Sequence, residues 1–338
     1  MKGTKAAYVR SGGIDASLSW KYVLRCSLTN NPWKGMICVM ERPKFVMHII
    51  IIIIVSIGAV SCNRITFPFT SKPAIQPGNY QRWLTVKGQS RSYHLHVPAN
   101  LDSLKSVPLV LAFHGYGGNA LSFQNASGFN EIADENSFLV VYPEGEGGNH
   151  SWNAEGCCGS AMQTNLEDVA FIRQVYSDMK TIADIDPKRI YASGFSNGGM
   201  FVYRLACEMS DVFAAIDLVA GPHFYDECEP SQPVSIIHVH GLADSTVPYA
   251  GGLFVDVQSL VFPPVEQGIT TWTELDGCSA SAEVEKQGIV MHTVYASCQE
   301  GTAVELYAIE GLDHSWAQPD VWPASQKIWE FFAAHPKP

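Results

Sequence analysis

The sequence lacks the clustered positive charge of a nucleic-acid-binding protein. Its 338 residues include 22 Lys and Arg against 33 Asp and Glu, so the formal net charge is −11. Binding to phosphates depends on grouped Lys and Arg side chains, and no basic stripe with interleaved aromatic residues is present. We therefore expect no nucleic-acid partner. With 46% hydrophobic and 16% charged residues, the composition is that of a globular chain.

The sequence also lacks the ligand spacing of a structural zinc site, because no second Cys-x-x-Cys or nearby His completes a tetrahedral set. Two His-x-His pairs, His94/His96 and His238/His240, place two imidazoles on one face of a strand. Neither pair has an obvious third ligand close by in the sequence. We expect these histidines to be buried or hydrogen-bonded, and we expect no metal and no cofactor. No internal repeat is present either.

Positive charge is concentrated before one apolar run. Residues 1–44 hold about 8 basic and 2 acidic side chains. Residues 45–62 contain an apolar run about 16 residues long, which is short for a transmembrane helix and sufficient for a signal-peptide core. If translation starts at Met40, residues 40–62 form a signal peptide. Residues 1–39 show no organised pattern, and we expect them to be an unstructured upstream extension.

The apolar run ends in small residues before Cys62, as in a bacterial lipoprotein signal whose cysteine is lipidated. Ordinary cleavage and a retained signal anchor are the alternatives. All three predict export, to a secreted form or to the cell envelope, with a membrane tether through Cys62 in the lipoprotein case. Residues 63–79 are rich in Pro, Ser and Thr and are expected to form a linker. Residues 80–338 then form one folded domain.

The cysteine content supports export. Beyond the apolar run the cysteines form an even set: Cys157, Cys158, Cys207, Cys228, Cys278 and Cys298. In an oxidising compartment six cysteines indicate up to three disulfides. Cys278 and Cys298 flank a short segment with strand-like runs, so we expect them to pair. Neighbouring Cys157 and Cys158 bridge only through a distorted peptide, and we expect each to pair with a different partner.

The folded domain alternates buried strands with amphipathic helices. Two short alternating runs, residues 81–88 and 91–98, predict an antiparallel hairpin. Continuous apolar strands are expected over residues 107–115, 138–145, 189–194, 213–221, 234–241 and 302–311. Helical spacing covers residues 122–135, 165–186, 198–209 and 325–335. This order predicts an α/β fold with a mainly parallel central sheet flanked by helices.

Residues 192–200, "ASGFSNGGM", contain Gly-x-Ser-x-Gly around Ser196. In a chain with 28 glycines such a match alone proves little, and a tight turn whose serine caps a helix is the alternative. Here the motif follows a strand and opens a helix, as a nucleophile elbow requires. Gly194 and Gly198 would let the neighbouring backbone approach closely. We therefore predict that Ser196 is a nucleophile.

A serine nucleophile needs a general base and a carboxylate that orients the base. Asp244 comes just after the strand ending at His240, and His314 lies between the last strand and the last helix. Ser, Asp, His is the chain order of the hydrolase fold. A solvated turn aspartate and a surface-loop histidine are the alternatives. Asp313 is another candidate carboxylate, although its adjacency to His314 makes it a poor orienter.

Further residues are expected around this triad. The oxyanion would be bound by the backbone N–H groups of Asn197 and of Tyr116, which lies in the turn "HGYGGN". Trp152 and Trp316 lie on loops near the expected catalytic face, and we expect them to line the substrate site. Core or rim positions for either indole are the alternative.

Six motifs in order carry a family resemblance: "FHGYGGN", "SWNAEGCCG", "DVAFIRQV", "DPKRIYASGFSNGGM", "HVHGLADSTVPYAGG" and "GLDHSW". Over about residues 80–335 the chain resembles the secreted polyhydroxybutyrate depolymerase and feruloyl esterase group of α/β-hydrolases, carbohydrate esterase family one. The resemblance implies an α/β-hydrolase catalytic domain. It also implies Ser196 as nucleophile, Asp244 as orienter, His314 as base, and disulfides in an exported protein.

These observations together predict an exported serine carboxylesterase that acts through an acyl-enzyme. Its substrates would be feruloyl or acetyl esters of plant polysaccharide, or hydroxyalkanoate oligomers. A serine peptidase of the same fold is one alternative. A non-catalytic binding protein on a hydrolase scaffold is another, although such proteins usually lose a triad residue.

Overall fold

The computed structural model describes residues 23–28, 36–41, 75–101, 105–225, 227–254, 260–279 and 281–338. The chain divides into two units, Met1–Phe69 and Thr70–Pro338. In the first unit, β1 (Val23–Leu28) pairs antiparallel with β2 (Met36–Glu41). This hairpin differs from the unstructured extension that we expected over residues 1–39.

The expected signal peptide after Glu41, Cys62 and the linker up to residue 74 lie outside the described residues. Among the residues that the structure describes, no helix combines the length and the hydropathy needed to cross a membrane.

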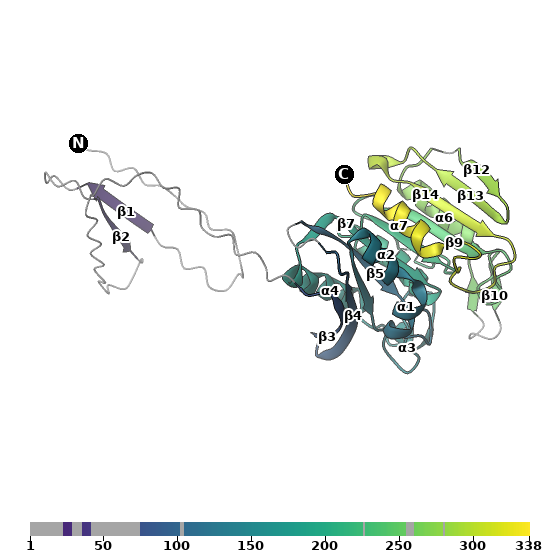
Figure 1. The fold of residues 1–338 in the computed structure, drawn as a ribbon, viewed down its shortest axis with the longest axis horizontal. Coiled ribbons are helices and arrows are strands. Elements are labelled where there is room, and N and C mark those ends of the chain that lie inside the picture. Colours follow the sequence, from purple (N-terminus) through teal and green to yellow (C-terminus); the bar gives the residue numbers. More distant parts are fainter. Residues whose placement is uncertain are drawn as a thin grey trace. The chain divides into compact units, whose positions relative to one another are not determined.

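A ten-stranded sheet forms the centre of the second unit (Figure 1). Its strands are β3 (Gly78–Val86), β4 (Gln89–Val97), β5 (Val107–Phe113), β6 (Leu139–Pro143), β7 (Ile185–Phe195), β8 (Ala215–Val219), β9 (Ser235–Gly241), β12 (Glu283–Gln287), β13 (Val290–Tyr295) and β14 (Val304–Ile309). Their order is β12-β13-β14-β9-β8-β7-β5-β6-β4-β3. From β14 to β6 all neighbours are parallel, and antiparallel hairpins close both edges. The predictions of a mainly parallel sheet and of an antiparallel hairpin over β3 and β4 are confirmed.

Helices cover both faces of the sheet. They are α1 (Ala120–Ser127), α2 (Phe129–Asn136), α3 (Gly159–Gln163), α4 (Asp168–Ile182), α5 (Asn197–Glu208), α6 (Val265–Leu275) and α7 (Ala324–Ala334). Successive residues of a strand point to opposite faces. Leu111 of β5 packs in a core cluster with α4, α5 and α6, whereas the next residue, Ala112, packs in a cluster with α1, α2 and α7. Because both faces are covered, β5, β6, β8 and β9 are buried along their whole length, as their continuous apolar runs indicated.

The helix expected over residues 122–135 is two helices in the structure. Gly128 has a φ of 76° and ends α1 before α2 begins. A left-handed glycine is the common way to stop a helix, because it lacks the Cβ that would clash there.

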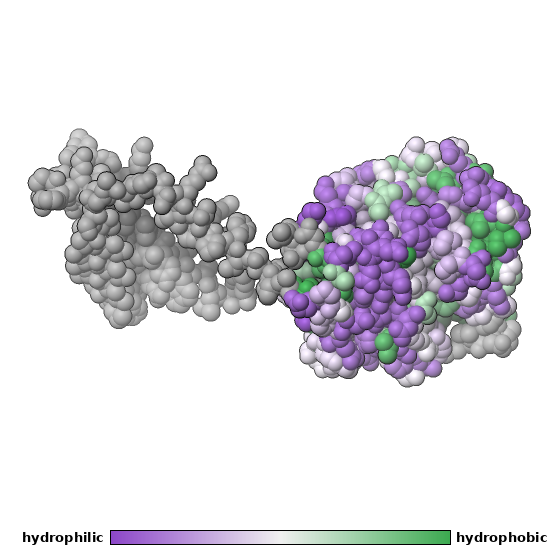
Figure 2. Space-filling model, in the orientation of Figure 1, coloured by the Kyte–Doolittle hydropathy of each residue, from purple (hydrophilic) through white to green (hydrophobic). Residues whose placement is uncertain are grey.

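The face of this unit shown in Figure 2 is largely hydrophilic, with small separate hydrophobic patches.

A short hairpin lies outside the main sheet. β10 (Gly252–Phe254) pairs antiparallel with β11 (Leu260–Phe262). It follows the segment that carries Asp244 and leads into α6.

Candidate active site

Ser196 lies at a sharp turn between β7 and α5. Its φ of 54° and ψ of −121° are rarely adopted by a residue with a side chain, so this backbone is held in place by its surroundings. The Ser196 N–H donates to the Val219 carbonyl at 2.8 Å, and the Ser196 carbonyl accepts from the Met200 N–H at 2.9 Å. These bonds to β8 and α5 fix the turn from both sides. This is the strand–turn–helix geometry that the sequence predicted.

The two glycines of the motif are required by close backbone contacts. A Cβ on Gly194 would lie 2.4 Å from the Gly198 carbonyl oxygen. A Cβ on Gly198 would lie 2.4 Å from the Phe113 carbonyl oxygen at the end of β5. Any side chain at either position would therefore push the start of α5 away from the sheet.

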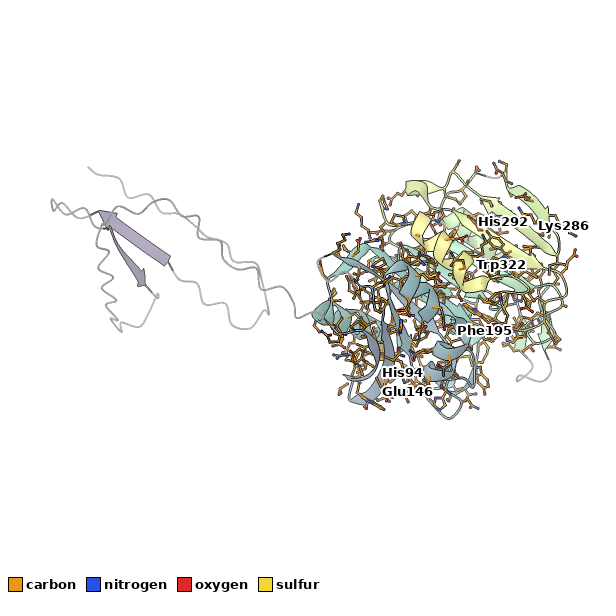
Figure 3. The ribbon with its side chains drawn as sticks, in the orientation of Figure 1. His94, Glu146, Phe195, Lys286, His292 and Trp322 are labelled. Carbon is orange, nitrogen blue, oxygen red and sulfur yellow. A yellow bond between two sulfur atoms is a disulfide. The ribbon has the colours of Figure 1, made fainter. Side chains whose placement is uncertain are left out.

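Ser196, His314 and Asp244 form a continuous hydrogen-bonded line. His314 Nε2 lies 2.9 Å from Ser196 Oγ, and His314 Nδ1 lies 2.8 Å from Asp244 Oδ2. The aromatic ring of Phe195, labelled in Figure 3, packs 5.0 Å from the His314 ring. The structure thus brings together the three residues that the sequence selected.

Asp244 is held as a carboxylate. Its Oδ1 accepts hydrogen bonds from the N–H groups of Thr246 at 2.9 Å and Val247 at 2.7 Å. Burial alone would raise the pKa of Asp244, but hydrogen bonds from His240, His314 and the Val247 N–H together lower it below its ordinary value. The group next to His314 is therefore negatively charged at neutral pH.

Strand order explains why these residues meet. Asp244 follows β9 and His314 follows β14, and these two strands are parallel neighbours. Asp313 takes another role, because its Oδ1 accepts from the Ser245 N–H and hydroxyl and from the His314 N–H. Asp313 therefore ties the two loops together, and the carboxylate that contacts the imidazole is Asp244.

The two expected oxyanion donors lie on segments that border Ser196. Asn197 is the first residue of α5, and N–H groups in the first turn of a helix have no acceptor within it. The turn after β5 also lies close to Ser196, since a Cβ on Gly115 would lie 3.3 Å from Ser196 Cβ. Tyr116 follows Gly115 and is exposed.

The side chain of Asn197 has a structural task that the sequence reasoning missed. Its Oδ1 accepts from the Trp152 N–H at 2.8 Å, and its Nδ2 donates to the carbonyls of Trp152 and Cys157, both at 3.1 Å. It therefore fastens the loop between β6 and α3 to the start of α5. Only the contact between segments distant in sequence reveals this role.

The structure places Trp152 and Trp316 in the hydrophobic core, which is the alternative that the sequence left open. Trp152 is fully buried and stacks on Phe201 at 5.3 Å, and its Nε1–H donates to the His114 carbonyl. Trp316 is 9% exposed, packs edge-on against Phe123 and donates to Ser325 Oγ. Both indoles bury a large apolar area with their N–H satisfied, which makes the core their favoured place.

The structure contains three disulfides within its described residues. Cys278–Cys298 is confirmed, and Cys207 pairs with Cys228. The expectation of separate partners for Cys157 and Cys158 is wrong, because these neighbours are bridged to each other. A bridge between neighbours was expected to need a distorted peptide, and the peptide between these two residues is cis.

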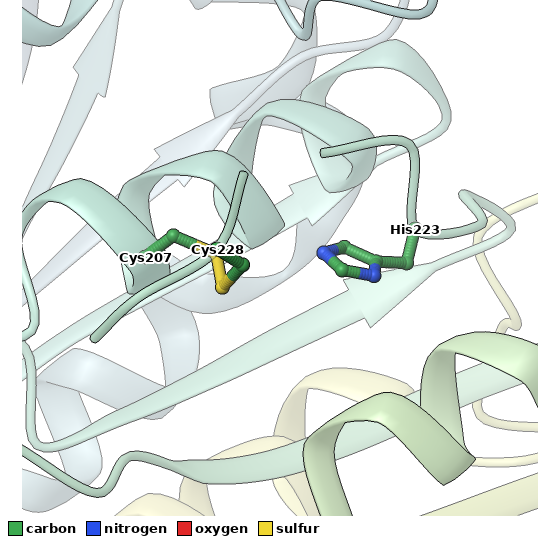
Figure 4. A group of neighbouring side chains, drawn as sticks. All are labelled: Cys207, His223 and Cys228. Atoms are coloured by element: carbon green, nitrogen blue, oxygen red, sulfur yellow. A yellow bond between two sulfur atoms is a disulfide. The ribbon is translucent and has the colours of Figure 1, made fainter. Parts of the chain in front are cut away.

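One group of candidate metal ligands occurs in the part of the chain that the structure describes: Cys207, His223 and Cys228, with ligand atoms within 4.8 Å of one another (Figure 4). The two cysteines are joined as a disulfide, so neither offers the thiolate that binds a metal. The group does not fit a metal site.

The strand histidines are buried or hydrogen-bonded, as expected. His96 is buried and bonds to Asn79 Oδ1 at 2.8 Å, and His94 lies 3.2 Å from Gln124 Oε1. His238 and His240 are fully buried, and His240 Nε2 lies 3.4 Å from Asp244 Oδ2.

Comparison with known proteins gives a consistent set of relatives. The chain is 28% identical over 252 residues to a bifunctional acetylxylan esterase/xylanase of Neocallimastix patriciarum, covering 72% of this chain and 33% of that protein. It is 29% identical to feruloyl esterase B of Piromyces equi, covering 64% and 41%. It is 31% identical to a probable feruloyl esterase C of Aspergillus flavus, covering 73% and 86%. The chain thus spans less than half the length of the first two relatives.

The solved structures agree on the fold. The acetyl xylan esterase from Aspergillus awamori matches with a TM-score of 0.53 at 15% identity, covering 75% of this chain and 99% of that one. At this identity the match shows a shared α/β-hydrolase fold. The family model for esterase PHB depolymerase matches residues 91–294, a segment that includes Ser196 and Asp244. The chain therefore belongs to the esterase PHB depolymerase family.

Proposed function

We propose that this protein is an exported serine carboxylic-ester hydrolase that acts through an acyl-enzyme. The observation that carries the proposal is the line of contacts from Ser196 Oγ through His314 to Asp244, with distances of 2.9 and 2.8 Å. A base that must take a proton from a nucleophile has to lie within hydrogen-bond reach of it. The esterase names in the family and among the relatives support the same chemistry.

In the proposed mechanism His314 Nε2 accepts the Ser196 proton as Oγ attacks the ester carbonyl carbon. His314 then donates this proton to the leaving alcohol, which departs and leaves an ester on Ser196. A water molecule, deprotonated by His314, then attacks the carbonyl carbon of this ester. The bond to Oγ breaks, His314 returns the proton to Ser196 Oγ, and the acid is released. Asp244 accepts from His314 Nδ1–H throughout, which keeps Nε2 free to act as a base and stabilises the imidazolium.

The negative charge that develops on the carbonyl oxygen needs donors in fixed positions. We assign this task to the backbone N–H groups of Asn197 and Tyr116. Both belong to segments that are locked against Ser196 by close backbone contacts, so the donors would be in place before the substrate binds.

The substrates proposed are feruloyl or acetyl esters of plant polysaccharide, or hydroxyalkanoate oligomers. The names of the relatives and of the family support this choice.

The three disulfides support export, since such bonds persist in oxidising compartments. We further propose that Cys62 carries a lipid tether, and mass spectrometry of the mature N-terminus tests it. An acylated Cys62 is expected, and an unmodified peptide spanning Ser61 and Cys62 would contradict it.

The activity is tested with p-nitrophenyl acetate. The Ser196→Ala variant should lose at least about a thousandfold in kcat, because the nucleophile is gone. Ser235→Ala is the matched control, a buried serine at the opposite, amino end of a parallel strand. Equal rates for wild type and Ser196→Ala would refute the proposal. A panel of methyl ferulate, acetylated xylan, hydroxybutyrate oligomers and a peptide p-nitroanilide then ranks the substrates and tests the peptidase alternative.

A further inference from the structure

A chain of buried polar side chains extends behind Asp244, away from His314. Tyr203 of α5 places its hydroxyl 2.9 Å from His238 Nδ1. His238 Nε2 lies 3.1 Å from His240 Nδ1. His240 Nε2 lies 2.8 Å from the Val247 carbonyl oxygen and 3.4 Å from Asp244 Oδ2. Tyr203, His238 and His240 are all fully buried.

With both rings neutral, the two acceptors at His240 Nε2 fix the direction of every hydrogen bond in this chain. A carbonyl and a carboxylate oxygen only accept, so His240 Nε2 must carry a proton. A neutral His240 then accepts at Nδ1, and His238 must donate from Nε2. Burial and the adjacent His240 ring lower the pKa of His238 well below its ordinary value, so His238 is neutral and accepts at Nδ1. The Tyr203 hydroxyl donates to it.

Every donor in the chain therefore points toward Asp244. Consecutive hydrogen bonds that run in one direction polarise one another, and they do so more strongly in a buried environment. Asp244 thus accepts from the His314 imidazole and from the N–H groups of Thr246 and Val247. On its third side lies His240 Nε2–H, whose nearer acceptor is the Val247 carbonyl at 2.8 Å and whose second is Asp244 Oδ2 at 3.4 Å.

We propose that His240 is a positioning residue of the triad, whose Nε2–H, held in that tautomer by His238 and Tyr203, aims the Asp244 carboxylate at His314. The inference rests on the proposed function, since it presupposes the triad. A hydrogen-bonded partner of this kind sets the tautomer and orientation of a catalytic group without itself contacting the substrate.

The hydrogen bond from His240 would also affect the pH dependence of catalysis. The ionisable groups near Asp244 are His314 on its one side, His240 on the other, and the exposed Asp313 in the His314 loop. A donor at Oδ2 draws negative charge away from His314. Removing it would let Asp244 hold the protonated form of His314 more strongly, so the acid limb of the kcat/KM profile would move to higher pH.

The kinetic test compares His240→Leu with His240→Gln, using p-nitrophenyl acetate from pH 4 to 9. We expect His240→Leu to lower kcat about tenfold or more with KM changed by less than about twofold, because the effect is on the reacting groups. Its acid limb should move up by roughly half a pH unit or more. His240→Gln carries an amide nitrogen that can reach the Nε2 position, and it should restore most of the loss.

His96→Leu is the matched control. His96 is also a buried strand histidine with two polar partners, Asn79 and Asp134, but it lies on β4, near the other end of the sheet order from β9. Its loss should reduce thermal stability without moving the pH profile. A folded His240→Leu with wild-type kcat and an unmoved acid limb would overturn the proposal, as would an identical pH shift in His96→Leu.

A second measurement needs no variant that could fail to fold. In ¹⁵N NMR spectra of the wild-type protein, His238 and His240 should both be neutral and protonated at Nε2. An Nδ1–H tautomer on either ring would overturn the proposal.

Tyr203→Phe removes only the first donor and should shift the acid limb in the same direction as His240→Leu, by a smaller amount. Ser196→Ala separates the two ideas: if it retains activity, the triad itself is wrong, whereas loss of activity there with no effect at His240 defeats only this inference.

Discussion

Nε2 of His314 lies 2.9 Å from Oγ of Ser196, although the two residues are 118 positions apart in the chain. The contact is made by two loops at the carboxyl ends of β7 and β14, which are separated in the sheet by β8 and β9. A rigid parallel sheet therefore sets this distance, and the backbone around Ser196 is fixed to the sheet by its own hydrogen bonds. The geometry that supports catalysis is built before any substrate arrives.

Two neighbouring carboxylates allow a sharp test of which one serves the base. Asp244→Asn should lower kcat by roughly a thousandfold to ten-thousandfold, because an amide that donates to Nδ1 would stabilise the wrong tautomer of His314. Asp313→Asn should have a much smaller effect, since Asp313 contacts the His314 backbone and Ser245 instead of the ring. Steady-state kinetics on an activated ester measures both. A larger loss in Asp313→Asn would reverse the assignment.

The elbow glycines predict a steric effect with a matched control. Gly198→Ala would place a Cβ 2.4 Å from the Phe113 carbonyl oxygen, so α5 must move, with an expected loss of several kcal/mol in the free energy of unfolding and of most activity. A Cβ on Gly148 would meet nothing within 4 Å. Gly148→Ala should therefore be close to neutral. Urea unfolding and ester hydrolysis report the two effects, and similar values for both variants would contradict the prediction.

Asp276 predicts a pH-dependent stability. Burial raises its pKa to about 7, although its Oδ1 accepts from the Val234 N–H. Between about pH 4 and 7 the unfolded carboxyl loses its proton while the folded one keeps it, so the free energy of unfolding falls by up to about 4 kcal/mol as pH rises. Asp276→Asn cannot ionise and escapes this loss.

Thermal unfolding at pH 5 and pH 8 measures the effect. The midpoint of Asp276→Asn relative to wild type should be higher at pH 8 than at pH 5. Any cost of the new amide group is the same at both values and cancels in the comparison. A difference that does not change with pH would show that Asp276 ionises normally in the folded protein.

The Cys278–Cys298 bridge should matter for stability more than for catalysis. Asp276, two residues before this bridge, accepts from Val234 ahead of the amino end of β9, whereas Asp244 follows its carboxyl end. Replacing both cysteines with serine should lower the free energy of unfolding by about 3 kcal/mol. The kcat of the folded variant at 25 °C should stay close to that of wild type. A loss of kcat in fully folded protein would contradict this separation.

The sequence by itself determined the parts that depend on local pattern. Continuous apolar runs indicated strands covered on both faces, as β5 and β9 are. The glycines on either side of Ser196 indicated a turn that admits no side chain, and the contacts at Gly194 and Gly198 explain why. Because strands in a parallel sheet end at one edge, the order Ser196, Asp244, His314 was enough to predict which side chains meet.

Only the tertiary structure decided what depends on distances between remote segments. The selection of Asp244 over its competitor Asp313 rested on chain position in the sequence, and the hydrogen bond to His314 Nδ1 now supports it. Trp152 occupies the core because Phe201 offers a stacking partner that no local pattern shows. The pair His238 and His240 was visible as a spacing, but its connection to Tyr203 and Asp244 exists only where β9, α5 and the following loop pack together. Contacts of this kind are set by packing, which is a property of the whole fold and not of any segment.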